Sequence, residues 1–284
     1  EDAQGVVDAL EFLRMYNIRG SVPVGKKVVV IGGGNAAIDA ARSALRLGAE
    51  TVTIIYRRGQ SEMPAYAEEI EEALHEGATI LPLTHPIEIR KNEQGWVRGL
   101  KCVKMKLGDF DQTGRRRPTA DQQDLLEIEA DQVIIAIGQS LDAAKVSKGT
   151  DLRISEKRFI EADPVNGKTS MEGVFAGGDA VSGPSSVVMA IASGERAAVG
   201  IDKYLSGEEH AFWRKTKEVE TEFDPDADPV PYPREPLPLV DVSRRKHNFD
   251  EVEHSWNEAV ARRQAKRCLR CDYGKCLHEK GGEE

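Results

Sequence analysis

Long hydrophobic runs, abundant cysteine and an excess of positive charge are all lacking in this sequence of 284 residues. Its apolar runs, such as Val28–Ile31 and Val133–Ile137, are as long as strands and far shorter than the ~20 residues of a transmembrane helix. Lys and Arg number 39 against 48 Asp and Glu, a formal charge of −9, which disfavours a duplex nucleic-acid footprint. We therefore expect no membrane span and no nucleic-acid partner.

Cysteine usage indicates the redox compartment. Four cysteines occur, and three of them crowd into Cys268, Cys271 and Cys276, which is unlike the framework of a disulfide-rich secreted domain. The chain opens at Glu1 without a basic segment and an apolar run of the secretory type. We expect a protein of the reducing cytoplasm, and we interpret the sequence as an excerpt from a longer polypeptide.

Residues 28–138 alternate between apolar, β-branched segments and helical patterns. Strands are expected at 28–31, 51–56, 79–84 and 133–138, helices at 36–47 and 64–76, and hairpins between 87 and 129. Residues 1–27 are expected to form an approach helix, which includes Val6 and Val7, followed by a turn. This alternation predicts an α/β fold with a parallel sheet and crossover helices.

The composition changes toward the C-terminus. Residues 139–172 are polar and irregular, 173–179 reads as a strand, and a long Ala/Val/Ile helix follows over 185–205. Six of the 13 prolines then fall between Pro225 and Pro238, so residues 207–247 are expected to form an extended linker or a strap on a surface. Residues 248–284 are expected to form a helix and a cysteine-bearing tail.

The strongest local motif is the glycine run after the first buried strand. It has the form G-x-G-x-x-A, with Gly32 at the tight turn, Gly34 where a pyrophosphate approaches the backbone, and Ala37 where helix and strand pack closely. Asn35 and Ala36 open the following helix, whose N-terminus offers unpaired N–H groups and partial positive charge to phosphates. The motif predicts a dinucleotide site.

The end of the second strand bears on which dinucleotide binds. A carboxylate there would bind the ribose hydroxyls of NAD, but this strand runs into Arg57 and Arg58, and the first acid is Glu62. Guanidinium groups suit a 2′-phosphate, which favours NADP. NAD remains an alternative, with both arginines as surface residues paired to nearby glutamates.

Several motifs in order resemble one known family. They are Gly32–Arg42, Tyr56–Arg58, Glu62–Ala65, Asp111–Pro118 and Ala136–Gly138. Over residues 5–206 the chain resembles the small subunit of glutamate synthase and its relatives. Those relatives include the electron-entry half of dihydropyrimidine dehydrogenase and the flavin subunits of NAD(P)–ferredoxin oxidoreductases.

The resemblance implies an NAD(P)-binding Rossmann domain, residues 28–138, inserted into an FAD-binding Rossmann domain. Residues 1–27 would connect from the FAD domain and 139–206 would return to it. Gly138 would be a cofactor-binding residue. Gly178 and Asp179 would belong to the second FAD motif, and the helix near Ser186 and Val187 would direct its N-terminus at the isoalloxazine. Asp179 as a simple helix cap is the alternative.

Two departures from the family pattern stand out. The first FAD fingerprint is expected N-terminal to residue 1, so this chain would carry only part of an FAD site. The cysteine run resembles the cluster-binding run of the glutamate synthase small subunit, which normally precedes the FAD domain but here follows it. A different assembly that uses the same electron-entry module is therefore expected.

The tail cysteines form a C-x₂-C-x₄-C pattern. Cys268, Cys271 and Cys276 supply three thiolates, and the surrounding Arg and Lys residues would lower the pKa of those thiols and offset cluster charge. We expect an iron–sulfur cluster of the 4Fe-4S type; the alternatives are zinc in the same site and no metal at all. The fourth ligand would be His278, a residue beyond Glu284 or a partner's residue. Cys102 is expected to be a core residue.

These features predict an electron-entry module of a flavin and iron–sulfur oxidoreductase in a multi-subunit complex. NAD(P)H would pass hydride to FAD, and single electrons would leave through iron–sulfur centres of the same chain or of ferredoxin-type partner subunits. Such a transfer depends on positioning, so we name no catalytic side chain. The alternatives are a catalytically silent docking subunit that keeps the fold and a true glutamate synthase small subunit.

Overall fold

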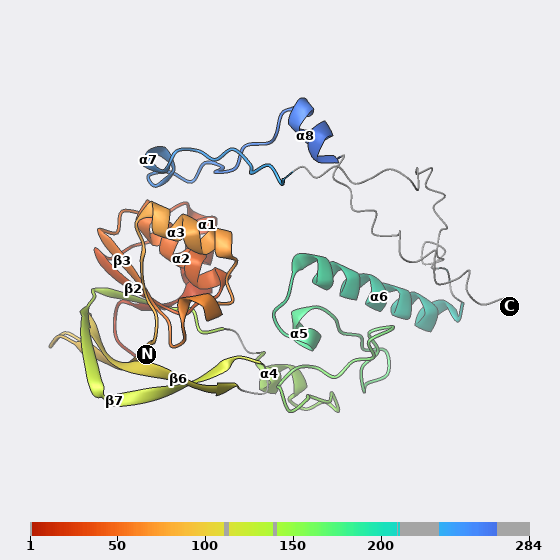
Figure 1. Cartoon of the computed structure of the whole chain (residues 1–284). Helices are drawn as coiled ribbons and strands as arrows, with labels where there is room; N and C mark the ends of the chain where they lie inside the picture. The colour runs from red at the N-terminus through yellow and green to blue at the C-terminus, as the bar shows by residue number, and fades with distance from the viewer. Residues whose placement is uncertain (1, 111–113, 139–140, 209, 211–232, 266–284) are drawn as a thin grey trace. The chain divides into compact units, whose positions relative to one another are not determined.

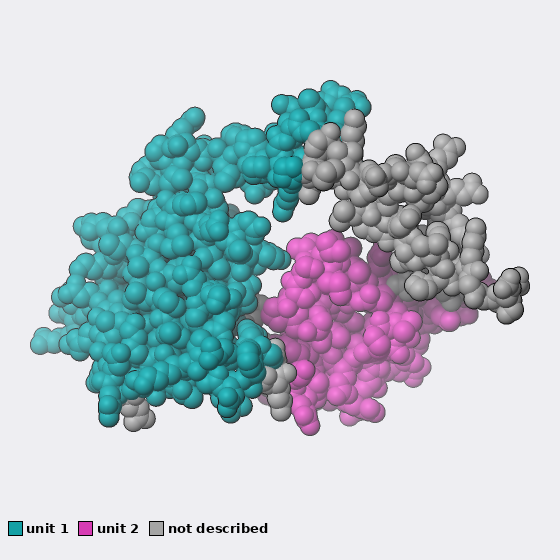
Figure 2. Space-filling view, viewed as in Figure 1, with its two compact units in different colours: residues 1–138, 225–284 teal, residues 139–224 magenta. Residues whose placement is uncertain are grey.

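The computed structural model describes residues 2–110, 114–138, 141–208, 210 and 233–265. The chain forms two compact units, one of residues 1–138 with 225–284 and one of residues 139–224 (Figure 2).

The first unit is built on a five-stranded sheet with the order β1-β8-β2-β3-β4, and each neighbouring pair is parallel (Figure 1). The strands are β1 (Val6–Asp8), β2 (Lys27–Ile31), β3 (Thr51–Ile55), β4 (Thr79–Leu81) and β8 (Gln132–Ile135). They are joined by the helices α1 (Ala9–Arg19), α2 (Asn35–Arg46) and α3 (Ala67–Glu76) and the 3₁₀ helix η1 (Gln60–Glu62). The predicted parallel sheet with crossover helices is confirmed.

The two faces of this sheet are covered by different structures. Val28 and Val30 of β2 pack in the core formed with the helices, whereas Val29 points to the other face. That other face is covered by an antiparallel sheet of β5 (Thr84–Lys91), β6 (Val97–Phe110) and β7 (Arg116–Glu129), which contributes the fully buried Leu100 and Cys102. The alternation along β2 thus produces three layers: helices, parallel sheet and antiparallel sheet.

The first residues differ from the sequence prediction. Val6 and Val7 lie in β1 beside β8 and not in a helix, because Asp8 begins α1 by capping it. The Asp8 carboxylate accepts hydrogen bonds from the backbone N–H groups of Leu10, at 2.9 Å, and Glu11, at 3.3 Å. A side-chain cap of this kind fixes where a helix starts.

The second unit contains α4 (Ala143–Ser147), α5 (Asp179–Ser182) and the 20-residue α6 (Val187–Ser206). The strand predicted over 173–179 is reduced to a single bridge between Lys168 and Phe175. The return of this region into an FAD-binding domain stays a prediction.

The C-terminal part of the first unit carries α7 (Val242–Arg245) and α8 (Glu258–Ala265). The helix predicted within residues 248–284 is therefore present, as α8. None of the helices in the described residues is long and apolar enough to cross a membrane. The cytoplasmic location expected from cysteine usage stays a prediction.

Two isoleucines near the end of β8 provide a matched test of the core. Ile134 is fully buried in the helix-side core, whereas Ile137 is 71% exposed. Ile134→Ala is expected to lower the free energy of unfolding by about 2–5 kcal/mol, because it removes buried methyl groups and leaves a cavity. Ile137→Ala should change it by less than about 0.5 kcal/mol. Chemical denaturation of both variants measures the difference, and equal losses would contradict this placement of the core.

Candidate functional site

The glycine loop lies at the carboxyl edge of the parallel sheet, where β2 ends between β8 and β3. Gly32 has φ +151°, and a Cβ there would lie 2.3 Å from the carbonyl oxygen of Ala136. At Gly33 a Cβ would lie 2.6 Å from the ring of Tyr56. At Gly34 the nearest atom would be Cγ of Pro64, at 3.9 Å. Two of the glycines thus permit close packing, and the third leaves open space above the loop.

The N-terminus of α2 is uncapped. Gly34 occupies the cap position without a side chain, and the first turn contains no acidic residue. The backbone N–H groups of Asn35 and Ala36 have no acceptor within the described part of the chain. Unpaired N–H groups and the helix dipole together favour an anion at this point. Ala37, the next residue of the helix, is fully buried and lets the helix lie close to the sheet.

A short loop after η1 supports the glycine run, which sequence reasoning did not foresee. The N–H of Ala65 donates to the carbonyl of Gly33 at 3.1 Å, and the N–H of Tyr66 donates to the side-chain oxygen of Asn35 at 3.0 Å. The amide oxygen of Asn35 is therefore engaged in holding the loop, which leaves its backbone N–H for a ligand. The only sequence signal was the Met-Pro-Ala motif that contributed to the family resemblance.

The two arginines after β3 have different surroundings. Arg57 is exposed, whereas Arg58 is only 7% exposed and donates from Nε to the carbonyl oxygen of Arg116 on β7 at 2.8 Å. Partial desolvation, and then the charge of Arg57, lower the pKa of His85. Of the two, only Arg57 is open to solvent, whereas Arg58 connects the end of β3 to the antiparallel sheet.

A pocket of about 590 Å³ opens beside the loop that follows η1, between η1 and the β6–β7 hairpin. Its lining combines apolar side chains with charged ones: Ser61, Glu62, Met63, Pro64, Leu107, Phe110, Gly114, Arg115 and Arg116. Its volume lies within the range of small-molecule sites in proteins. Glu62 lines the pocket, and its carboxylate accepts a hydrogen bond from the N–H of Gly59 at 2.9 Å.

Gly138 ends the same edge of the sheet. It follows β8, which pairs with β2, and it has φ +107°. A Cβ at this position would have no neighbouring atom within 4 Å among the described residues. The backbone is thus exposed next to the glycine loop, since the carboxyl ends of adjacent parallel strands share one edge.

The other predicted cofactor residues lie in the second unit. Gly178 precedes α5 with φ +63°, and its N–H donates to Oγ of Ser193 at 2.9 Å. Asp179 is exposed, and its carboxylate makes no hydrogen bond or ion pair among the described residues, so a capping role is not observed. Ser186 caps α6 by accepting from the N–H of Met189, and Val187 is 76% exposed at the helix start.

The predicted metal ligands Cys268, Cys271 and Cys276 lie outside the described residues, as does His278. No group of three or more His, Cys, Asp or Glu residues in the described ranges could hold a metal ion. Cys102 is buried in β6, which confirms the prediction of a core residue, and burial raises the pKa of its thiol to about 11.

The chain matches a known protein family and several curated proteins. The sequence profile of the pyridine nucleotide-disulphide oxidoreductases matches residues 4–194. The NADP(+)-dependent formate dehydrogenase subunit beta of Moorella thermoacetica is 40% identical over 94% of the chain and 39% of its own length. The NADPH-Fe(3+) oxidoreductase subunit beta of Geobacter sulfurreducens is 35% identical over 92% and 44%. The NADPH glutamate synthase small chain of Escherichia coli is 36% identical over 72% and 46%.

These matches confirm the resemblance to the glutamate synthase small subunit and its relatives. The chain spans less than half the length of each of the three relatives. Among solved structures, Mycobacterium tuberculosis FprA in complex with NADPH has a TM-score of 0.57 at 20% identity, over 73% of this chain and 60% of its own. At that identity the likeness concerns the fold.

The glycine loop makes a prediction about stability. Gly32→Ala is expected to lower the free energy of unfolding by more than about 2 kcal/mol, because the added methyl group collides with a backbone carbonyl at an unfavourable φ. Gly34→Ala should change it by less than about 1 kcal/mol, since φ is −91° and the space is open. Denaturant titration measures the free energy of unfolding of both variants. A larger loss at Gly34 than at Gly32 would show that the loop is arranged differently.

Thiol reactivity tests the surroundings of Cys102. Because the thiol is buried and its pKa is raised to about 11, native protein at pH 8 is expected to leave Cys102 unmodified by iodoacetamide. The same residue should be alkylated once denaturant is added. Peptide mass spectrometry reads both states, and rapid alkylation of Cys102 in the native protein would refute its burial.

Proposed function

The chain belongs to the pyridine nucleotide-disulphide oxidoreductase family, and on that premise we propose that it is the electron-entry module of a larger flavin and iron–sulfur oxidoreductase. In this role it binds NADPH, whose hydride reduces an FAD, and the electrons continue singly to iron–sulfur centres. The observation that carries the proposal is the uncapped N-terminus of α2 above a glycine loop with open space at Gly34.

The pyrophosphate of NADPH is assigned to the N-terminus of α2. The backbone N–H groups of Asn35 and Ala36 would donate to its oxygens, and Gly34 would let it approach. Gly138, at the same edge of the sheet, adds exposed backbone beside the nucleotide. Ala37 contributes indirectly, because its small side chain sets how close the helix lies to the strand.

Arg57 is assigned to the 2′-phosphate. It is exposed directly after β3, where an NAD-specific site would carry a carboxylate. Arg58 would support it by fixing the end of β3 to the carbonyl of Arg116. The names of the three relatives include NADP or NADPH, which supports this cofactor over NADH. The neighbouring pocket beside η1 has the size and mixed polarity to take the adenosine end.

The FAD is assigned to the second unit, whose residues suit it. The start of α6 offers an exposed apolar surface at Val187 and the positive end of a 20-residue helix dipole, both suited to an isoalloxazine that gains negative charge on reduction. Gly178 and the unengaged carboxylate of Asp179 offer hydrogen-bonding groups to the ribityl–pyrophosphate part, with Ser186 shaping the helix start. When bound, FAD accepts a hydride and releases electrons singly.

The electron acceptors are assigned to iron–sulfur centres. Cys268, Cys271 and Cys276 would supply three thiolates to a cluster of the 4Fe-4S type, and further centres would belong to partner subunits. The names of two relatives identify them as beta subunits and that of a third as a small chain, which supports a multi-subunit assembly. Zinc bound by the same thiolates would stabilise the structure of the tail but could not carry electrons.

Binding measurements on Arg57 variants test the nucleotide assignment. Arg57→Ala is expected to weaken NADPH binding at least about tenfold and leave NADH binding unchanged, because a hydrogen bond to a charged group contributes about 1.5–3 kcal/mol. Isothermal titration calorimetry of the intact protein measures both affinities.

Arg19→Ala is the matched control for this test. It removes the same charge at the C-terminal end of α1, which follows β1 back toward the opposite edge of the sheet. NADPH and NADH affinities should both match those of the unaltered protein. A loss of NADPH affinity that is equal in the Arg57 and Arg19 variants would exclude a specific 2′-phosphate contact.

A further inference from the structure

Residues 233–256, which we call the strap, form an ordered hairpin-like element in the first unit (Figure 1). The N–H of Val240 donates to the carbonyl of Val252 at 2.9 Å, and the N–H of His254 donates to the carbonyl of Pro238 at 2.8 Å. The indole N–H of Trp256 donates to the carbonyl of Pro236 at 3.2 Å. The proline-rich segment therefore has its own internal hydrogen bonds, and α7 lies at its turn.

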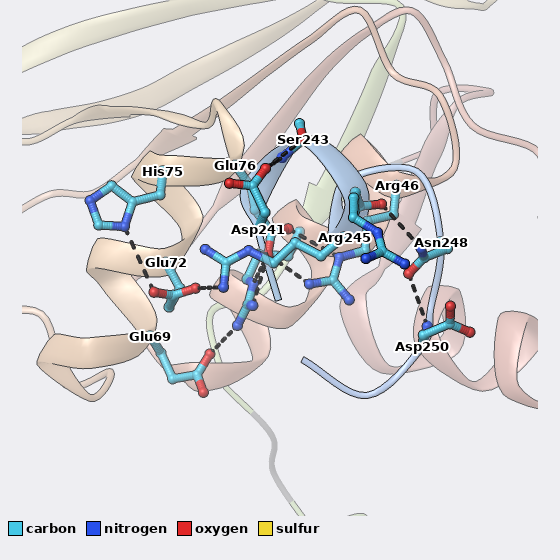
Figure 3. Close-up of polar contacts among 12 residues, drawn as sticks. Arg46, Glu69, Glu72, His75, Glu76, Asp241, Ser243, Arg245, Asn248 and Asp250 are labelled. Atoms are coloured by element: carbon cyan, nitrogen blue, oxygen red, sulfur yellow. Dashed lines mark hydrogen bonds and ion pairs between the residues drawn. The ribbon is translucent and has the colours of Figure 1, made fainter. Parts of the chain in front are cut away.

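One side chain of the strap is buried in the nucleotide-binding unit. Arg245, at the end of α7, is 2% exposed and forms ion pairs with Glu72 and Glu76 of α3 (Figure 3). Four residues later the ring of Phe249 stacks on Tyr16 of α1, with 4.1 Å between ring centroids. The same ring lies under the guanidinium of Arg46, 5.9 Å away. Both a charge and an aromatic contact hold the strap.

The charges beneath the strap are unbalanced without it. Two guanidiniums of α2 pair with Glu69 and Glu76 of α3. The third carboxylate, Glu72, pairs with Arg245 and lies 3.7 Å from Nδ1 of His75. Arg42 binds Glu69 at 2.5 Å and Glu76 at 2.8 Å, and Arg46 binds Glu76 at 2.6 Å. Burial alone would raise the pKa of Glu76, but hydrogen bonds from the two arginines lower it, so its buried carboxylate is charged. Arg245 supplies the third cation.

The segment after the strap is tied back to it. Arg263 of α8 forms an ion pair with Glu235, and the side-chain oxygen of Gln264 accepts from the N–H of Glu235 at 3.3 Å. Helix α8 ends at Ala265, three residues before Cys268. Whatever fixes the strap therefore also fixes the point from which the cysteine-bearing tail departs.

We propose that the acidic face of α2 and α3 is a docking surface for the strap. Arg245 is the anchor, because its cation balances the carboxylates of this face. Through the strap it also holds the end of α8, from which the cysteine-bearing tail departs, on the nucleotide-binding unit. Helix α2 then has two roles. Its N-terminus faces the nucleotide, and Arg42 and Arg46 in its later turns carry the docking surface. Nothing in this docking depends on which cofactor the chain binds.

Hydrogen–deuterium exchange of the intact protein tests the anchor. Arg245→Met keeps the length of the side chain but removes the cation, which leaves a buried carboxylate uncompensated. Exchange is expected to become at least about tenfold faster in peptides covering the strap and α8, while peptides of β2 and β8 stay protected. The control Arg262→Met removes an arginine whose ion pair with Glu258 is exposed, and it should leave strap exchange unchanged.

A double variant separates docking from general stability. In Glu72→Gln/Arg245→Met the two remaining carboxylates match Arg42 and Arg46, so any fall in Tm that the unpaired carboxylate causes in Arg245→Met should be reversed. Strap exchange should stay fast, because the anchoring cation is still missing. Strap exchange as slow in Arg245→Met as in the unaltered protein would overturn the proposal. The proposal would also be overturned if the exchange rate rose equally in the strap and in β2 and β8, in both the single and the double variant. That result would indicate only global destabilisation.

Discussion

The backbone N–H groups at the start of α2 need a hydrogen-bond acceptor, and the described residues supply none for Asn35 and Ala36. Helices α1 and α6 meet the same need with a side chain, Asp8 and Ser186 respectively. Helix α3 also lacks a side-chain cap, but its first turn carries Glu68 and Glu69. At α2 the chain places glycine instead, at the carboxyl edge of a parallel sheet. The surrounding structure maintains this exposed positive end, and an anionic ligand satisfies it best.

The supports around that helix end come from distant parts of the sequence. Tyr56 packs against Gly33, the Met-Pro-Ala loop donates to the glycine run and to Asn35, and Arg58 fixes the end of β3 to β7. At its later turns α2 is held to α3 through Glu76, and the strap completes the charge there. The same helix is thus fixed at both ends by residues that no local pattern connects.

Local patterns in the sequence were sufficient for the sheet and the glycine loop, because β-branched runs, the G-x-G-x-x-A spacing and the alanines of α2 each act over a few residues. The prediction of a helix at Val6 and Val7 is wrong because an apolar pair fits a short strand as well as a helix. The Asp8 cap decides between the two structures. The unequal surroundings of Arg57 and Arg58 depend on the carbonyl of Arg116, 58 residues away. The docking of Arg245 on α3 joins residues that lie still farther apart in the sequence, and no motif spacing predicts such a contact.

In the proposed function, electrons enter through NADPH bound at the start of α2. The decisive experiment is an anaerobic titration of the intact, flavin-containing protein with NADPH, and separately with NADH, in which the visible absorbance of the flavin is followed. Rapid loss of that absorbance is expected with NADPH and much slower loss with NADH at equal concentration. An absorbance that neither nucleotide changes would rule out electron entry at this site and leave the chain as a docking subunit that has kept the fold.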